Sequence, residues 1–171
     1  MDNMWELITN IVLILAFITV GAFAVLGLTQ WIKRKSLKKV DKQLLWLPLP
    51  LALMALTYII FDKLLPELVD FMPTRPNGSG EPSFPSTHVM LVATIFFCTV
   101  IILPKYIKSK TIRILLELAM VIGLALTCTG RVMANLHTVV DVIGAIAFAF
   151  IFSEIYFQVI KTRKKYKKSK K

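Results

Sequence analysis

The chain has 171 residues, of which 56% are hydrophobic, yet its formal net charge is +11. Its mean hydropathy is +0.69, and a water-soluble domain of this length would not combine such apolarity with such charge. The apolar residues lie in long runs and the charges in clusters, a pattern typical of integral membrane proteins. The two cysteines, Cys98 and Cys128, both fall in apolar runs and indicate no disulfide framework.

Five apolar runs of about 18 residues or more follow one another, and each could cross a hydrocarbon core of about 30 Å as a helix. They cover residues 7–32, 44–62, 87–104, 112–130 and 138–160. Acidic rather than basic residues precede the first run, so we do not expect a cleaved signal peptide. Pro48 and Pro50 are expected to bend the second helix. Small residues later in the chain would let helices approach closely: Gly123, Gly130, Gly144 and Ala145. The sequence therefore predicts an all-α bundle of five transmembrane helices.

The basic residues indicate how the bundle is oriented. Eighteen of the 21 lysines and arginines follow the first, third and fifth runs. With five spans these clusters fall on one side, which the positive-inside rule makes cytoplasmic. We expect the N-terminus outside, a membrane domain over residues 1–160, and a basic cytoplasmic tail over residues 161–171 that meets solvent or lipid headgroups. Tethering of this tail to a membrane argues against nucleic acid as its partner.

The loop between the second and third runs, FMPTRPNGSGEPSFPSTH (residues 71–88), contains four prolines and two glycines. This composition favours a stiffened irregular loop. Ser86 or Thr87 is expected to be the N-cap of the third helix. Taken alone, Arg75 could be a snorkelling lipid contact and His88 a histidine at headgroup level without a chemical role.

The segment GRVMANLHTVVD joins the fourth and fifth runs, and its only charged or titratable residues are Arg131, His137 and Asp141. Ionisable groups at a membrane boundary are costly and often functional. If the second half is helical, His137 and Asp141 share one face, one turn apart. The carboxylate could then hold one ring nitrogen and leave the other aimed outward as a base or nucleophile. The alternative is an ion pair that merely stabilises a helix start.

Topology relates these two segments to each other. The third and fifth helices both begin on the outer side, so two helix N-termini with partial positive charge face the same surface. Together with the nearby side chains they describe a site for phosphate or a similar oxyanion: Arg75, His88, Arg131, His137 and Asp141. No cysteine or carboxylate cluster supplies a closed metal shell, and two histidines with one aspartate would make a poor metal site, so we expect neither a metal nor a cofactor.

The spacing resembles the type 2 phosphatidic acid phosphatases, the lipid phosphate phosphatase superfamily that includes vanadium-dependent haloperoxidases. Their pattern is Lys, six residues, Arg-Pro; then Pro-Ser-Gly-His; then Ser-Arg, five residues, His, three residues, Asp. This chain has the same order and spacing: Arg75-Pro76, Pro85-Ser86-Thr87-His88, and Gly130-Arg131 followed by His137 and Asp141.

The resemblance implies that His137 attacks phosphorus and becomes phosphohistidine, with Asp141 orienting the ring. His88 would protonate the leaving oxygen and later activate water. The phosphoryl oxygens would be held by Arg75, Arg131 and Ser86, with Thr87 beside them where the family has glycine. No metal enters this scheme.

Three positions depart from the family pattern. Leu68 stands where the family has lysine, and Lys63, five residues earlier, could substitute only if the loop bends back. Thr87 replaces glycine and places a β-carbon where backbone would approach phosphate. Gly130 replaces serine and loses one hydroxyl donor. The lysine charge missing at position 68 is expected to reduce the rate or the affinity for a diphosphate more than it changes the mechanism.

The expectation is a phosphatase of the plasma (inner) membrane whose active site lies on the extracytoplasmic face. Its substrate would be a lipid phosphate monoester or an isoprenyl diphosphate, of the phosphatidate, phosphatidylglycerol phosphate or undecaprenyl diphosphate class. One alternative is a catalytically weakened lipid-binding relative, which the residues at 68 and 87 favour. A membrane transporter or proton relay is the other, suggested by Glu117 and Glu154 near the cytoplasmic ends of the last two runs, where snorkelling or pairing with bases is the simpler account.

Overall fold

The computed structural model describes residues 2–69 and 72–168, with side chains over 4–69 and 72–161. Within these residues the elements are helices, and five are long and apolar enough to cross a membrane. These spans match the five predicted runs: Met4–Arg34, Lys42–Leu68, Thr87–Tyr106, Lys110–Met133 and Val139–Lys161. The predicted fold class, an all-α bundle with five transmembrane helices, is confirmed.

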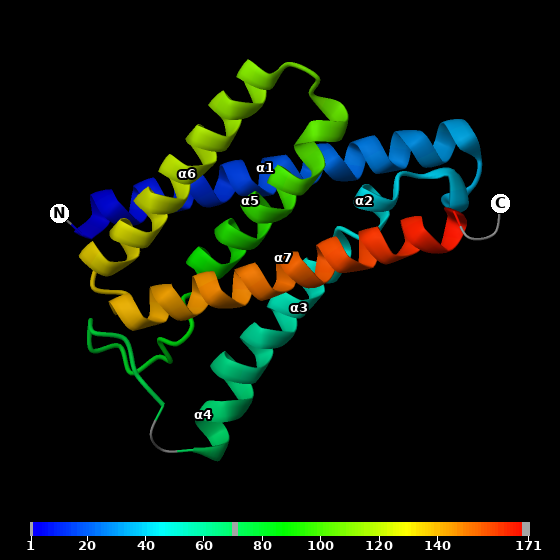
Figure 1. Cartoon of the computed structure of the whole chain (residues 1–171). Coiled ribbons are helices and arrows are strands. Elements are labelled where there is room, and N and C mark those ends of the chain that lie inside the picture. The colour runs from blue at the N-terminus through cyan, green and yellow to red at the C-terminus, as the bar shows by residue number, and fades with distance from the viewer. Residues whose placement is uncertain (1, 70–71, 169–171) are drawn as a thin grey trace.

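Helix α5 is the centre of the bundle, with α1, α3, α6 and α7 packed around it (Figure 1). Its side chains are mostly buried, whereas α1, α6 and α7 leave many large apolar side chains exposed, as lipid-facing surfaces require. The elements in chain order are α1 (Asp2–Arg34), the short helix η1 (Leu37–Lys39), α2 (Lys42–Leu45), α3 (Pro48–Tyr58), the π-helix η2 (Ile59–Leu64), α4 (Leu65–Leu68), α5 (Thr87–Tyr106), α6 (Lys110–Met133) and α7 (Val139–Lys168).

The second span is not the single bent helix that the sequence suggested. Pro48 and Pro50 lie in the first turn of α3, where a missing N–H removes no intrahelical hydrogen bond and the fixed φ suits a helix start. They therefore begin a helix instead of bending one. Beyond Tyr58 the span continues as η2 and α4.

The connection between α4 and α5 contains a short hairpin and is less irregular than expected. Thr74 and Pro82 form an antiparallel bridge, and the Arg75 N–H donates to the Glu81 carbonyl at 2.9 Å. The Gly78 N–H closes the turn on the Arg75 carbonyl at 3.2 Å. We call residues 72–86 the hairpin.

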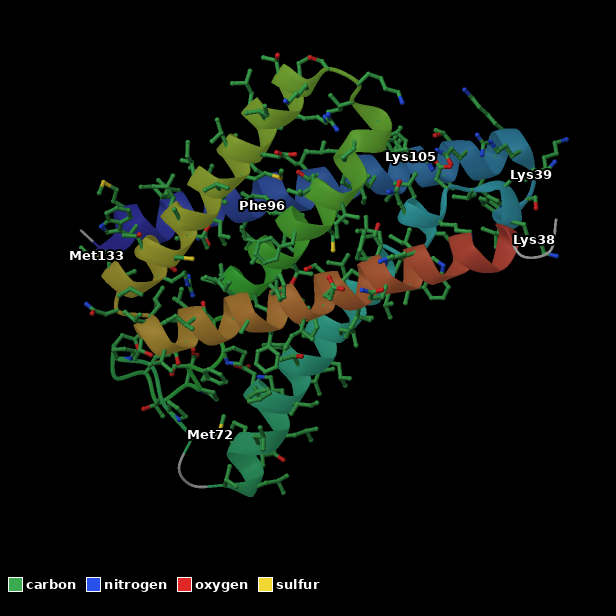
Figure 2. All side chains as sticks on the ribbon, in the orientation of Figure 1. Lys38, Lys39, Met72, Phe96, Lys105 and Met133 are labelled. Carbon is green, nitrogen blue, oxygen red and sulfur yellow. The ribbon has the colours of Figure 1, made fainter. Side chains whose placement is uncertain are left out.

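The two ends of the bundle differ in composition. Met72 and Met133 lie toward the end where α1 begins, α6 ends and α7 begins, which we call the hairpin end (Figures 1 and 2). Lys38, Lys39 and Lys105 lie toward the other, the basic end (Figure 2). This separation matches the charge pattern from which the orientation in the membrane was predicted.

Small residues allow neighbouring segments to approach closely: helix α1 at Gly130, as predicted, and the hairpin, not a helix, at Gly144. A β-carbon on Gly130 would lie 2.5 Å from Thr9 Cγ2 on α1, and one on Gly144 would lie 2.3 Å from Phe84 Cε2. Ala145 is fully buried. Serine at position 130 would therefore collide with α1, which gives a packing reason for the glycine there.

Candidate functional site

The turn between α6 and α7 holds His137 through its backbone. Asn135 has a left-handed φ of 54°; its N–H donates to the Val132 carbonyl at 3.0 Å, and the Leu136 N–H donates to the Arg131 carbonyl at 3.1 Å. This pair of bonds is a Schellman motif, with asparagine at the left-handed position. The His137 N–H also donates to the Arg131 carbonyl, at 3.2 Å, so the end of α6 fixes the histidine's position.

Helix α7 begins with a capping box. The Thr138 N–H donates to Asp141 Oδ2 at 2.6 Å, and the Asp141 N–H donates to Thr138 Oγ1 at 3.3 Å. His137 therefore precedes the helix, so the condition for a shared helical face, a helix that includes His137, is not met. Asp141 Oδ2 still lies 3.8 Å from His137 Nδ1. The aspartate thus stabilises the helix start through Thr138 and not through the ion pair offered as an alternative, and its charge also acts on the imidazole.

The hydrogen bond that orients the His137 ring comes from the hairpin. Nδ1 lies 2.8 Å from the carbonyl oxygen of Ser83, 54 residues away. A carbonyl only accepts, so Nδ1 carries the hydrogen and the neutral ring has its lone pair on Nε2. That Nε2 is buried and has no hydrogen-bond partner among the described residues. The sequence assigned this orienting contact to Asp141; the structure gives it to a backbone carbonyl.

Burial, followed by the positive charge of Arg131, lowers the pKa of His137 from 6.5 to about 4. The bond to Ser83 and the charge of Asp141 raise the pKa, but by less than burial and the arginines lower it. The ring is therefore neutral at physiological pH, with an available lone pair.

Two guanidinium groups act electrostatically on this imidazole. Arg131 is only 4% exposed, and its Nε has no partner among the described side chains. Arg75 Nε is likewise buried and unpartnered, while its Nη1 lies 2.6 Å from Glu81 Oε2. Buried cations without full pairing are costly, so this arrangement suits an incoming anion.

The start of α5 contributes further donors. Ser86 is the N-cap residue, one of the two predicted, but its side chain makes no capping bond and its buried Oγ has no described partner. The Ser86 N–H donates to the Asp141 carbonyl at 3.2 Å, which ties this helix start to that of α7. Thr87 and His88 are the first two residues of α5.

Electrostatic interactions connect these groups across the site. His88 interacts with Arg75, Arg131 and His137, and His137 interacts with both arginines and Asp141. The structure therefore gathers most predicted site residues at the hairpin end, beside the start of α7 (Figure 1): Arg75, Ser86, Thr87, His88, Arg131, His137 and Asp141.

Lys63 does not join this cluster. Its side chain is 64% exposed, and its Nζ lies 3.5 Å from Asp62 and 5.9 Å from the centre of the Tyr58 ring. The suggestion that it replaces the missing lysine is therefore wrong in this structure. Leu68, at the lysine position, is 76% exposed.

Sequence reasoning missed three contributors. Ser83 supplies the carbonyl that orients His137, Glu81 pairs with Arg75, and Thr138 completes the capping box. The Thr-x-x-Asp spacing could have revealed Thr138. Nothing local could have revealed Ser83, because its contact depends on where the hairpin packs.

A family model described as the PAP2 superfamily matches residues 51–165. No curated protein matches the chain. Among solved structures, the chain is similar to a transmembrane PAP2 type phosphatidylglycerolphosphate phosphatase from Bacillus subtilis, with a TM-score of 0.63 and 18% sequence identity. The similarity covers 93% of this chain and 77% of that chain. At this identity the likeness concerns the fold, and the family match includes every residue of the cluster described above.

Proposed function

The chain belongs to the PAP2 superfamily, and from that premise we propose that it hydrolyses a phosphate ester of a membrane lipid at the hairpin end. The observation that carries the proposal is the unpartnered, lone-pair-bearing Nε2 of His137 beside Arg75 and Arg131. A nitrogen nucleophile among cations suits phosphoryl transfer, where positioning and charge stabilisation supply most of the catalysis.

In the proposed reaction, His137 Nε2 attacks phosphorus and the bond from phosphorus to the lipid oxygen breaks. His88, in its protonated form, gives a proton to that oxygen and becomes neutral. Water, activated by the same imidazole, then attacks the phosphohistidine and releases phosphate. The negative charge of Asp141, 3.8 Å from Nδ1, stabilises the positive charge that His137 gains when Nε2 bonds to phosphorus.

The phosphoryl oxygens would meet the two guanidinium groups, the Ser86 hydroxyl and the first N–H groups of α5. Thr87 would contribute its backbone N–H to these donors. Four buried atoms from these elements lack partners within the described part of the chain: Arg75 Nε, Ser83 Oγ, Ser86 Oγ and Arg131 Nε. Buried polar groups are ordinarily satisfied, so their gathering around one imidazole supports an oxyanion site.

The charge of the site favours a single phosphate over a diphosphate. Glu81 already pairs with Arg75, Lys63 lies elsewhere, and position 68 is leucine. We therefore propose a lipid phosphate monoester, of the phosphatidate or phosphatidylglycerol phosphate class, as the substrate. The second candidate is an isoprenyl diphosphate such as undecaprenyl diphosphate, and a panel of these lipids separates the two by released phosphate.

The decisive experiment measures phosphate release by purified wild-type protein and by His137→Ala, His137→Gln and Lys63→Ala. The two His137 variants should be inactive although they keep the wild-type circular dichroism, and K63A should remain active because Lys63 lies outside the cluster. Radiolabelled substrate should leave acid-labile phosphate on the wild-type protein only. Unchanged release by both His137 variants would contradict the mechanism. Release absent from the wild type itself would favour the catalytically weakened, lipid-binding alternative.

Metal independence is part of the same proposal. Chelators should leave the rate unchanged, whereas vanadate, which mimics five-coordinate phosphorus, should compete with the substrate. Activity lost in EDTA and restored by Mg²⁺ or Zn²⁺ would contradict this part of the mechanism.

A further inference from the structure

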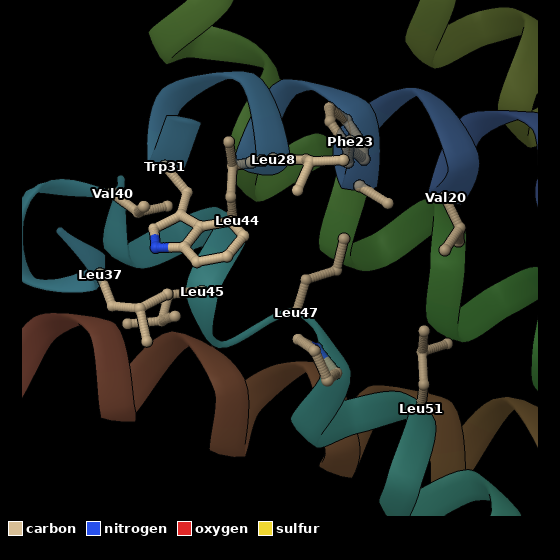
Figure 3. A pocket seen from close by; sticks show the side chains of 13 residues that line it. Val20, Phe23, Leu28, Trp31, Leu37, Val40, Leu44, Leu45, Leu47 and Leu51 are labelled. Atoms are coloured by element: carbon tan, nitrogen blue, oxygen red, sulfur yellow. The ribbon is translucent and has the colours of Figure 1, made fainter. Parts of the chain in front are cut away.

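An apolar groove lies at the basic end, far along α1 from the site described above. It is bounded by the second half of α1 and by the segment from η1 to α3, and its volume is about 430 Å³ (Figure 3). This volume falls within the usual range for small-molecule sites. None of the described residues that line the groove is charged, and its walls include large apolar side chains from both segments: Phe23, Leu28, Trp31, Leu37, Leu44 and Leu47.

The dimensions of the groove suit a lipid chain. Along α1 its lining runs from Val20 to Trp31, which is about 16 Å at the rise of an α-helix. That length is roughly half of a 30 Å hydrocarbon core, which is the depth of one leaflet. A smaller hollow beside Trp31 and Lys35 adjoins the groove at Trp31, next to the basic residues.

The end of the groove meets a concentration of positive charge. Residues 33–42 contain six basic residues and one acid, Asp41. The carboxylate of Asp41 is already paired with Lys105 at 2.7 Å and accepts the Tyr106 hydroxyl at 2.6 Å. The segment therefore has a surplus of positive charge: Lys33, Arg34, Lys35, Lys38, Lys39 and Lys42.

This basic segment is held in place by contacts with its neighbours. Gln30 on α1 accepts from the Asp41 N–H at 2.9 Å and donates to its carboxylate at 3.0 Å. Arg34 Nη1 donates to the Lys39 carbonyl. A segment already fixed in this way loses little conformational freedom when a ligand binds.

We propose that this groove binds an anionic phospholipid of the leaflet at the basic end, with one acyl chain along α1 and the headgroup phosphate against residues 33–42. A second copy of this chain is a poorer occupant because it would bring the same six basic residues to the contact. The site is separate from the histidines, and the proposal does not depend on the reaction proposed above.

Trp31 provides a direct probe, because it lines the groove and is one of only three tryptophans. The full chain with Trp5→Phe and Trp46→Phe is reconstituted in phosphatidylcholine. Brominated phosphatidylglycerol is then compared with brominated phosphatidylcholine as a quencher of Trp31 fluorescence. The anionic lipid should bind roughly fivefold or more tightly, and the preference should shrink as salt is raised.

Matched variants locate the effect. The preference for the anionic lipid should be abolished in a triple variant with Lys35→Gln, Lys38→Gln and Lys39→Gln. It should be preserved in a second triple variant, which removes as much charge near the α5–α6 turn: Lys108→Gln, Lys110→Gln and Arg113→Gln. Ala24→Phe, at an exposed position that lines the groove, should weaken quenching by both lipids. Each variant is checked for wild-type helicity and gel-filtration behaviour.

Several outcomes would overturn the proposal: equal quenching by the two lipids, a preference that survives in the first triple variant, or one lost equally in both triple variants. Disulfide cross-linking between copies through Leu28→Cys, in a chain with both native cysteines replaced, would instead assign the groove to a second copy. Because fluorescence reports binding alone, an absence of phosphatase activity would leave these results unaffected.

Discussion

At the scale of single residues, the tautomer of His137 follows from one backbone contact. The Ser83 carbonyl requires a hydrogen on Nδ1 and leaves the lone pair on Nε2. Burial, followed by the charge of Arg131, lowers the pKa of His137 and keeps the imidazole neutral. The nucleophile of the proposed mechanism, oriented by the hairpin and kept neutral by burial and a neighbouring arginine, is thus assembled from three separate segments.

The titration of His137 can be observed directly, because the chain contains only two histidines. In His88→Asn, produced without a histidine tag and with ¹⁵N-labelled histidine, one imidazole remains. We expect its NMR signals to titrate near pH 4 and to show the proton on Nδ1 at pH 7. Because its folded pKa is depressed, the ring takes up its proton only as the pH falls through about 4. A midpoint near the ordinary value, or a proton on Nε2, would contradict the proposed nucleophile.

Asp141 combines two roles that substitutions can separate. Asp141→Asn keeps an oxygen that can accept the Thr138 N–H, so it should preserve stability, whereas Asp141→Ala should lose about 1 kcal/mol through the broken cap. Both variants remove the negative charge 3.8 Å from the imidazole and should lower kcat about a hundredfold. The measurements are thermal unfolding in detergent and initial rates. Full activity in D141N would show that the carboxylate serves only as a helix cap.

At the scale of elements, much could be predicted because the deciding signals are local. Long apolar runs indicated the spans, and Arg131, His137 and Asp141 stood out as costly groups at a membrane boundary. The hairpin could not be predicted in the same way, because a contact between Ser83 and His137 depends on tertiary packing across 54 residues. Pro48 was misjudged because a proline that begins a helix and one that bends it look alike within an unbroken apolar run.

The packing between the hairpin and α7 leads to an element-scale prediction. A β-carbon on Gly144 would lie 2.3 Å from Phe84 Cε2, and Phe84 directly follows Ser83. Gly144→Ala should therefore displace the carbonyl that orients His137 and reduce kcat roughly a hundredfold, with a modest loss of stability. Steady-state rates in detergent provide the measurement.

Two further variants control for general effects of an added methyl group. Gly123→Ala meets Val12 at 3.3 Å, a contact that a small shift can relieve, so it should keep its activity. Phe84→Leu combined with G144A should recover part of the lost rate by making room for the methyl group. If G144A has wild-type activity, the Phe84 packing does not control the position of His137.

At the scale of the whole molecule, the candidate site and the lysine clusters lie at different ends of the bundle. The two histidines interact with Arg75 and Arg131 near the hairpin, whereas Lys38, Lys39 and Lys105 lie toward the other end of the bundle (Figure 2). An odd number of spans places the start of α1 and the far end of α7 at opposite ends (Figure 1). From the positive-inside rule we predict that the basic end lies in the cytoplasm and the proposed catalytic site on the extracytoplasmic face.

Cysteine labelling in intact cells tests this orientation. Cys98→Ala and Cys128→Ala remove the native thiols, and single cysteines are then introduced as Ser79→Cys in the hairpin or Lys108→Cys beside the α5–α6 turn, both exposed positions. A membrane-impermeant maleimide should label S79C in intact cells and K108C only after permeabilisation, because the lysine-rich loops are retained in the cytoplasm. The reverse pattern would place the histidines on the cytoplasmic face, where they would meet lipid phosphates of the inner leaflet, and the proposed substrate pool would change with them.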